Sequence, residues 1–562
     1  MLVAFLAWAT VLLAICYVLK EGYRLVIERN ASEASVQLTT ACTWGFLIVG
    51  SAVFFFVDPL HASNFPISDS IEFAVAAHRA ALLGSFDILV ENVAYPPRYS
   101  PWFPLLILAP LYHLLGAEIG NAIYATTFFA VLGVATAYLL GILVAARWGG
   151  LLAVALLLTV PGYRYFGRQV MTDVPFVTVV LLALLVYLVI VNGKSVGWKH
   201  YACAGIILAL GYWLRPLAVA LLVPFVALPL IYRSPGNLVI KLLLLCFPIL
   251  GFVVATLVYN AAVFGDYFRT GYHFWVPVPY DYLDLTFSVQ YLSKNFEVLY
   301  RDVGLGPLLG FGLALLLVQK GIFKDQKKIW LGKKVFVQSM IFFALVAVPL
   351  LSFHLFYFYS SSRFFLPLRV LLTVLVGGLA GRLVSKAALD KRAPVLIAGF
   401  ACLVMVLYGW NVKPDFPDIR ATADRIADNT FEDATIISKL NPIYFQLLVQ
   451  AGTQRTLLPW SREVEYASKA VAWRRVSVLD PPPINWEDHR AEGLLRGGAN
   501  DPILRVAQDD PRIVGDLINA GREVFVDTSA FSLDEVKLLT KSYRLEPITE
   551  SLYWIHLAQK SS

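Results

Sequence analysis

A small set of acids and arginines, each close to a long apolar run, could carry chemistry in this sequence. Asp69 and Glu72 follow one such run, Asp173 precedes another, and Arg98 and Arg215 each lie beside a proline. Two further arginines in comparable positions are Arg168 and Arg363. Ionisable groups in or beside a membrane are costly, so each is a functional candidate. Because a guanidinium fork binds phosphate and keeps its charge, this set predicts a phosphate ester as ligand, next to a group that needs a base.

Asp69 has two interpretations in its local sequence. It opens a helical pattern of apolar residues that Gly84 is well placed to end. With Glu72 three residues later, it could be the N-cap in a variant of the capping box. It could also be a carboxylate at the membrane surface, because the segment 95–102, rich in proline and aromatic residues, belongs at a membrane–water interface. Both interpretations remain open on the sequence alone.

The composition predicts a polytopic membrane protein. Of 562 residues, 58% are hydrophobic and 15% charged, with a mean hydropathy of +0.67, whereas about a quarter of residues are charged in a soluble chain. The apolar residues come in blocks of about 15–25, long enough to cross a bilayer, and we expect about 11–13 transmembrane helices. Residues 2–19 lack a basic start and a cleavage site, which indicates a retained helix. The candidate spans are 2–19, 40–57, 102–116, 121–146, 150–164, 172–192, 201–214, 216–232, 239–262, 304–319, 335–351, 364–381 and 395–409.

Lysine and arginine clusters predict the orientation of these spans. The densest clusters, Lys320–Lys334 and Arg382–Arg392, should be cytoplasmic. Counting spans from them places residue 1 and everything after Trp410 on the outer face. The outer loops are then 58–103, 264–303 and 352–363.

This orientation puts Asp69 and Asp173 on the same face, which requires an even number of crossings between them. Three apolar runs lie there, so one of them does not span. The candidates are the run 102–116, which is rich in proline, and the run 150–164, which ends in Pro161-Gly162.

Other partner classes are not indicated. The sequence contains no basic stripe with interleaved aromatic residues, so nucleic-acid binding is not indicated. All five cysteines lie in apolar runs without C-x-x-C spacing, which indicates core residues and neither disulfides nor a zinc site.

Residues 411–562 have a soluble composition and predict a small α/β domain on the outer face. Strands are expected at 434–438, 456–458, 523–527 and 552–557, and helices at 442–450, 511–520 and 532–541. The segment has no G-x-G-x-x-G and no P-loop. We therefore expect a lid or an acceptor-docking module.

Several ordered motifs in residues 40–410 resemble the GT-C glycosyltransferases, in particular the branch of the bacterial aminoarabinose–lipid A transferase and the protein O-mannosyltransferases. An Asp after a transmembrane helix opens an amphipathic helix, here Asp69 to Asp87, and a Tyr-x-Pro-Pro-x-Tyr-type segment follows. The remaining pieces, in chain order, are Arg168/Met171/Asp173/Pro175, Arg215-Pro216, Asn260/Phe264/Gly265/Gly271/Tyr272 and Arg363 to Pro367.

The resemblance implies a GT-C membrane domain over residues 1–410 in the plasma (inner) membrane. It also implies an inverting enzyme that moves a sugar from a polyprenyl phosphate carrier to an acceptor hydroxyl on the outer face. By position, Asp69 would be the general base, and Asp173 would orient the donor sugar, a metal or the acceptor. The donor phosphate would bind to Arg215, helped by Arg363 or Arg98. Further substrate-binding residues would be Glu72, Tyr95, Arg168, Tyr272 and His273.

Two departures from the family pattern leave details open. Ser70 stands directly after Asp69, where the family often has a second acid, so a divalent metal is possible but not indicated. The lysine frequently found before Pro-Pro is absent, and Arg98 is a candidate replacement. The acceptor could be a glycan, a lipid or a protein.

Structural roles remain alternatives for several of these residues. Arg168 and Arg363 could be interfacial anchors. His273 and His354, lone histidines in aromatic surroundings, are more readily explained as structural. A rival function is a transporter or lipid flippase, although the charges gather at helix ends on one side and no internal repeat is visible, unlike in many transporters. A non-catalytic scaffold would keep the fold and leave Asp69 dispensable.

Overall fold

The computed structural model describes most of the membrane region and the sheet of the C-terminal region. The described ranges are 2–30, 34–56, 101–116, 119–194, 196–231, 237–264, 283–322, 329–386, 419–439, 455–459 and 512–557, with the short pieces 70, 73–74, 76–77, 80–81, 266–268, 270 and 399.

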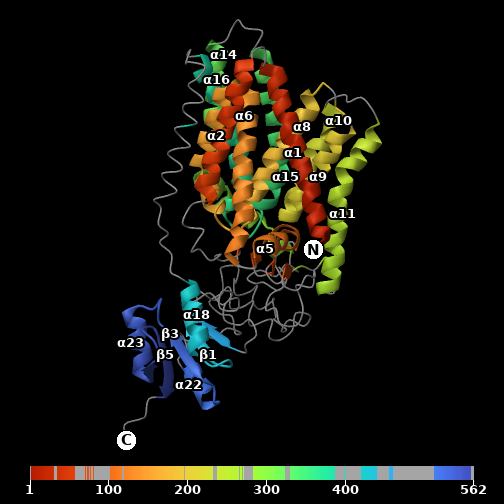
Figure 1. Ribbon diagram of the computed structural model, residues 1–562. Coiled ribbons are helices and arrows are strands. Elements are labelled where there is room, and N and C mark those ends of the chain that lie inside the picture. Colours follow the sequence, from red (N-terminus) through yellow and green to blue (C-terminus); the bar gives the residue numbers. More distant parts are fainter. Residues whose placement is uncertain are drawn as a thin grey trace.

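A bundle of long apolar helices forms most of the molecule (Figure 1). Within the described ranges, seven helices are long and apolar enough to cross a membrane, or eight if the bent pair α13–α14 is one span. The predicted run 395–409 lies almost wholly outside these ranges, and the runs 150–164 and 216–232 form shorter apolar helices. The chain is thus a multi-pass helical membrane protein, as predicted.

The helices are α1 (Leu2–Asn30), α2 (Ala34–Phe56), η1 (Phe103–Leu108), α5 (Ala109–Leu115), η2 (Ile119–Ala122), α6 (Ile123–Thr159), α7 (Pro161–Phe166), α8 (Asp173–Asn192), α9 (Trp198–Leu214), η3 (Pro216–Leu221), α10 (Leu222–Ile231), α11 (Leu238–Phe264), α12 (Leu283–Thr286), η5 (Val289–Tyr291), α13 (Leu292–Arg301), α14 (Leu305–Ile322), α15 (Ile329–Leu355), η6 (Ser362–Phe365) and α16 (Leu366–Lys386).

Helix α6 is folded back on itself as a hairpin. A Cβ atom added to Gly141 would collide with the backbone carbonyl of Gly149, although residues eight apart in a straight helix are separated by about 12 Å. Beyond the second arm, the Tyr163 hydroxyl donates a hydrogen bond to the Ala130 carbonyl of the first arm at 2.6 Å. The runs 121–146 and 150–164 therefore run antiparallel, and together they provide the even number of crossings that the sequence requires.

The run 102–116 is the one that does not cross. We call the end of the bundle where α1 begins and α11 ends the lower end, as it is drawn in Figure 1. The Trp102 indole donates a hydrogen bond to Thr256, in the second half of α11, at 2.7 Å. The His113 ring meets that of Phe5, near the start of α1, at 6.1 Å between centroids. Since both contacts lie towards the lower end, η1 and α5 form a half-helix there, and α5 is drawn there in Figure 1.

Small residues let the helices at the centre of the bundle approach closely. Helix α16 packs along both arms of α6, and a Cβ atom on Gly381 would collide with the Gly149 backbone. Beside these helices, nearly every residue of α8 is buried, from Asp173 to Ile190. Trp8 of α1 contacts Phe129 of α6, whose carbonyl accepts a hydrogen bond from Thr178 of α8. Helix α8 therefore begins at the lower end, and Asp173 with it.

The C-terminal region contains the predicted α/β unit. Its five-stranded sheet has the order β2-β1-β3-β5-β4, in which β1 is parallel to β2 and β3, and β5 is antiparallel to β3 and β4. Figure 1 draws this unit beyond the lower end of the bundle. Two elements, α18 and β4, were not predicted, and the expected helix 442–450 lies outside the described residues. The elements are α18 (Ile419–Asn429), β1 (Thr435–Ser438), β2 (Thr456–Pro459), α22 (Arg512–Asn519), β3 (Val524–Asp527), α23 (Leu533–Ser542), β4 (Tyr543–Pro547) and β5 (Leu552–Leu557).

Candidate functional site

Antiparallel helices bring three of the predicted site residues to the lower end of the bundle. Asp173 is the first residue of α8, where a carboxylate interacts favourably with the helix dipole. Arg215 follows the last residue of α9, which ends there because Pro216 comes next. Arg363 lies in η6, directly before α16, and His354 is in the last turn of α15.

Arg215 and Asp173 form a buried ion pair. The Arg215 Nη2 atom lies 2.6 Å from Oδ1 of Asp173, and its Nε donates a hydrogen bond to the Thr172 hydroxyl at 3.1 Å. The Asp173 side chain is fully buried, whereas that of Arg215 is 18% exposed. The guanidinium also lies 5.8 Å from the centre of the Phe176 ring. The contacts with Thr172 and Asp173 thus hold the Arg215 guanidinium in one orientation.

The ion pair uses only half of the Asp173 carboxylate. Its Oδ2 atom is buried and accepts no hydrogen bond from the described part of the chain. Buried polar atoms nearly always have a partner, so Oδ2 is available to a donor outside the described residues.

His354, which the sequence did not single out as a site residue, lies at the same end of the bundle as this ion pair. Its ring is 6% exposed and stacks on Phe364 at 4.7 Å between centroids, with an interplanar angle of 9°. Helices α8 and α15 run antiparallel, because Asn192 donates a hydrogen bond to Gln338 and the Tyr187 ring meets Phe342, so His354 lies level with Asp173. The Cζ of Arg363 lies 5.5 Å from the centre of the Phe364 ring, so these aromatic contacts also connect Arg363 to the group. A histidine in the last turn of an apolar helix was the available sequence signal.

Arg168 lies elsewhere at the lower end, against the end of α2. Its guanidinium carbon is 4.2 Å from the centre of the Phe54 ring, and its Nη2 donates to the Phe54 carbonyl at 3.4 Å. These contacts fit the anchoring interpretation of Arg168, and its substrate-binding role stays a prediction.

The helix expected after Asp69 is present in the residues that the structure describes. Ser70, Phe73 and five alanine positions from 74 to 81 are helical, and nearly all of them are buried. Phe73 packs edge-on against Phe103 of η1 at 5.1 Å between ring centroids. This helix therefore lies beside the half-helix. Outside the described residues are Asp69, Glu72, Tyr95, Arg98, Tyr272 and His273.

Within the described ranges, no three His, Cys, Asp or Glu side chains come together as a metal site. Asp69 and Glu72 are not among the described residues.

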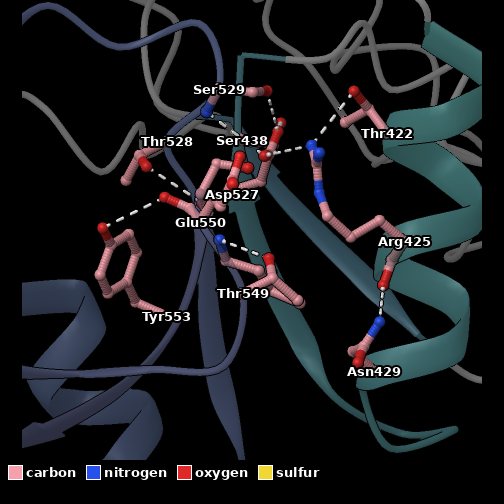
Figure 2. Close-up of polar contacts among 12 residues, drawn as sticks. Thr422, Arg425, Asn429, Ser438, Asp527, Thr528, Ser529, Thr549, Glu550 and Tyr553 are labelled. Carbon is pink, nitrogen blue, oxygen red and sulfur yellow. Dashed lines mark hydrogen bonds and ion pairs between the residues drawn. The ribbon is translucent and has the colours of Figure 1, made fainter.

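A second buried aspartate lies in the C-terminal sheet (Figure 2). The Oδ2 atom of Asp527 accepts hydrogen bonds from the hydroxyls of Ser438 and Ser529 at 3.0 and 2.9 Å. Its Oδ1 faces Arg425 of α18 at 3.4 Å and the Ser529 backbone N–H at 3.3 Å. Since both oxygens have protein donors, Asp527 holds β1, β3 and α18 together, and we assign it a structural role.

Comparison with known proteins identifies the fold. No protein-family model matches the sequence, and no curated protein matches it. Among solved structures, the chain is similar to ArnT from Cupriavidus metallidurans bound to undecaprenyl phosphate, with a TM-score of 0.53, 12% identity, and coverage of 93% of this chain and 98% of ArnT. The same protein in its apo state matches with a TM-score of 0.51 and 11% identity over 91% of this chain and 96% of ArnT. The chain therefore has the fold of ArnT, which confirms the GT-C membrane fold that the sequence motifs predict.

Proposed function

We propose that this chain is a membrane glycosyltransferase that moves a sugar from a polyprenyl phosphate carrier to an acceptor hydroxyl. The observation that carries the proposal is the buried Arg215–Asp173 pair, with its unused carboxylate oxygen, at one end of the bundle. It stands in a fold that ArnT uses to bind undecaprenyl phosphate.

Arg215 is proposed to hold the phosphate that leaves with the carrier. Its Nε and one Nη2 hydrogen are engaged by Thr172 and Asp173, and its remaining N–H donors, which make no hydrogen bond with the described residues, can bind phosphate oxygens. Because the fork is already oriented, it stabilises the negative charge that develops on the phosphate without first having to reorganise.

Asp173 is proposed to do two things. Oδ1 orients Arg215, and Oδ2 accepts a hydrogen bond from a hydroxyl of the donor sugar or of the acceptor. A second phosphate oxygen is a poor partner for Oδ2, since both groups are anionic. This deepens the sequence-based assignment, in which Asp173 orients the sugar, a metal or the acceptor.

Asp69 remains the proposed general base of an inverting transfer. As the acceptor hydroxyl attacks the anomeric carbon, the bond to the phosphate oxygen breaks and the hydroxyl proton passes to the Asp69 carboxylate. Asp69→Asn separates this role from helix capping, because Asn caps almost as well as Asp but accepts no proton. Turnover should fall by about 100-fold or more with unchanged thermal stability. Turnover close to the wild-type rate would assign Asp69 to capping alone.

The proposed location of the reaction is the outer face of the plasma (inner) membrane, with the C-terminal α/β unit outside the cytoplasm. A reporter that is active only in the cytoplasm, fused after Ser562, should stay silent. An active reporter would place the site on the cytoplasmic face and remove the argument for an outer-face lipid-linked donor.

Mass spectrometry of envelope glycans and lipids from cells with and without the gene tests the proposal as a whole. We expect one glycan, lipid or protein to lose a single sugar when the gene is deleted. Identical acceptors, with a changed distribution of lipid-linked sugar across the membrane, would contradict transfer and favour a flippase.

A further inference from the structure

His354 is surrounded by aromatic rings, as a core phenylalanine would be, but its imidazole also carries a buried nitrogen that needs a hydrogen-bond partner. Its ring stacks on Phe364 and meets Phe353 and Phe365 edge-on. Phenylalanine would fill such a box without any unpaired polar atom. Instead, the Nδ1 atom of His354 is buried and has no hydrogen-bond partner among the described residues. An unpaired buried nitrogen is unfavourable, so a partner that arrives from outside the chain is the simplest explanation.

The place of His354 indicates what that partner is. The antiparallel packing of α8 and α15 brings the His354 ring level with Asp173, the ion-pair partner of Arg215. Oδ2 of Asp173 and Nδ1 of His354 are both buried and lack a protein partner in the described ranges. Oδ2 can only accept a hydrogen bond, whereas an imidazole carries at least one N–H in either protonation state. A ligand with a hydroxyl on one side and an anionic oxygen on the other satisfies both atoms.

We infer that His354 is a phosphate-binding residue, which donates a ring N–H to the phosphate of the lipid donor beside Arg215. The inference rests on the proposed function and deepens it. Arg363 contacts the same Phe364 ring, with its Cζ 5.5 Å from the ring centre. Stacking on Phe364 fixes the plane of the imidazole and hence the direction of its N–H groups.

Two substitutions separate hydrogen bonding from packing. His354→Phe keeps the stacked ring and removes the N–H, while His354→Gln removes the ring and keeps an N–H donor. The full-length protein in nanodiscs is titrated with undecaprenyl phosphate. We expect His354→Phe to raise the Kd by about 10- to 100-fold at an unchanged Tm, as for the loss of a hydrogen bond to a charged group. His354→Gln should recover part of the affinity.

Three controls assign the effect to the phosphate of the lipid. Undecaprenol, which lacks the phosphate, should bind equally to wild type and His354→Phe. Inorganic phosphate is added as a competitor. Displacement of the lipid would indicate a site for free phosphate, whereas no displacement indicates a site for the lipid headgroup. His113→Phe, at an exposed histidine that also contacts an aromatic ring, should leave the Kd unchanged.

The outcomes distinguish this inference from the proposed function. Wild-type affinity in His354→Phe, with binding lost in Arg215→Ala, would overturn the role of His354 and leave the glycosyltransferase proposal standing. An equal loss of affinity in the Phe and Gln variants, accompanied by an equal fall in Tm, would also overturn it and make His354 structural. A wild-type protein that does not bind undecaprenyl phosphate would contradict both.

Discussion

Two buried aspartates, one in the membrane bundle and one in the C-terminal sheet, show the difference between an open and a closed polar site. Each faces an arginine, Asp173 at 2.6 Å and Asp527 at 3.4 Å. Asp527 also accepts three hydrogen bonds from Ser438 and Ser529, so its capacity is used by its own domain. Asp173 leaves Oδ2 without a donor among the described residues.

The difference separates two uses of the same residue type. A network whose members are all satisfied rigidifies the elements it connects. A network with one open acceptor leaves free energy to be gained when a ligand supplies the missing donor. Substitutions at Asp527 should therefore affect stability alone, whereas substitutions at the membrane pair should also affect chemistry.

The largest effect is expected for Arg215→Ala. Loss of the guanidinium removes the charge proposed to hold the departing phosphate, and kcat/KM for the lipid donor should fall by at least about 100-fold. It also leaves Asp173 buried and unpaired, which costs about 3–5 kcal/mol of stability. Both quantities are measured on the purified protein in nanodiscs.

Two control variants accompany Arg215→Ala. Arg215→Lys should recover only part of the activity, because an ammonium lacks the planar fork. The double variant Arg215→Met/Asp173→Leu should regain stability without regaining transfer. Unchanged donor kinetics in Arg215→Ala would exclude its role in phosphate binding.

The next largest effect is expected for Asp173→Asn. It tests the aspartate whose Oδ2 atom has no donor among the described residues. The amide oxygen can still accept a hydrogen bond from Arg215, so we expect Tm to change little. The charge that orients the guanidinium, and that we propose to bind a hydroxyl, is lost, and transfer should fall by about 10- to 100-fold. A large fall in Tm with normal turnover per folded molecule would instead make Asp173 a structural residue like Asp527.

Asp527→Asn tests the aspartate whose two carboxylate oxygens both have protein donors. Its carboxylate accepts from two hydroxyls, a backbone N–H and Arg425, and an amide cannot accept from all of them. We expect a loss of about 1–3 kcal/mol in the stability of the C-terminal sheet. Limited proteolysis of the full chain during a thermal ramp measures it. Transfer below the unfolding temperature should be nearly normal, and a specific loss of turnover without destabilisation would move Asp527 into the functional site.

Arg425→Met should have the smallest effect of the series. This arginine is 28% exposed and lies 3.4 Å from Asp527, so the solvent screens the pair, and the two serines remain as donors. The same proteolysis experiment should show a loss below about 1 kcal/mol. A loss as large as that of Asp527→Asn would mean that the arginine dominates the network.

The sequence predicted most of the helices and strands, but it missed strand β4 and helix α18. Blocks of apolar residues revealed the bundle, and the strands β1, β2, β3 and β5 were predicted from short apolar runs. Strand β4 was missed because it follows α23 with no turn residue between them. Helix α18 was missed because its composition is largely polar and only one side is apolar.

The choice between the runs 102–116 and 150–164 depended on packing, which hydropathy does not record. Both are short apolar helices. What distinguishes them is the close contact of Gly141 with Gly149, which folds the second run back along the first.

The candidate site was predicted in part. Counting spans placed Asp173 and Arg215 on one face, although they are 42 residues apart. Their direct contact, and the position of His354 beside them, depend on how three helices pack, and no local pattern encodes that.

The most direct test of the account is mass spectrometry of the envelope acceptor in cells that produce only one variant, either Asp173→Asn or Asp527→Asn, at matched levels of membrane protein. We predict that the single-sugar modification is strongly reduced with Asp173→Asn and persists with Asp527→Asn. Persistence at the wild-type level in cells with folded Asp173→Asn would contradict the assignment of the membrane pair as the site of transfer.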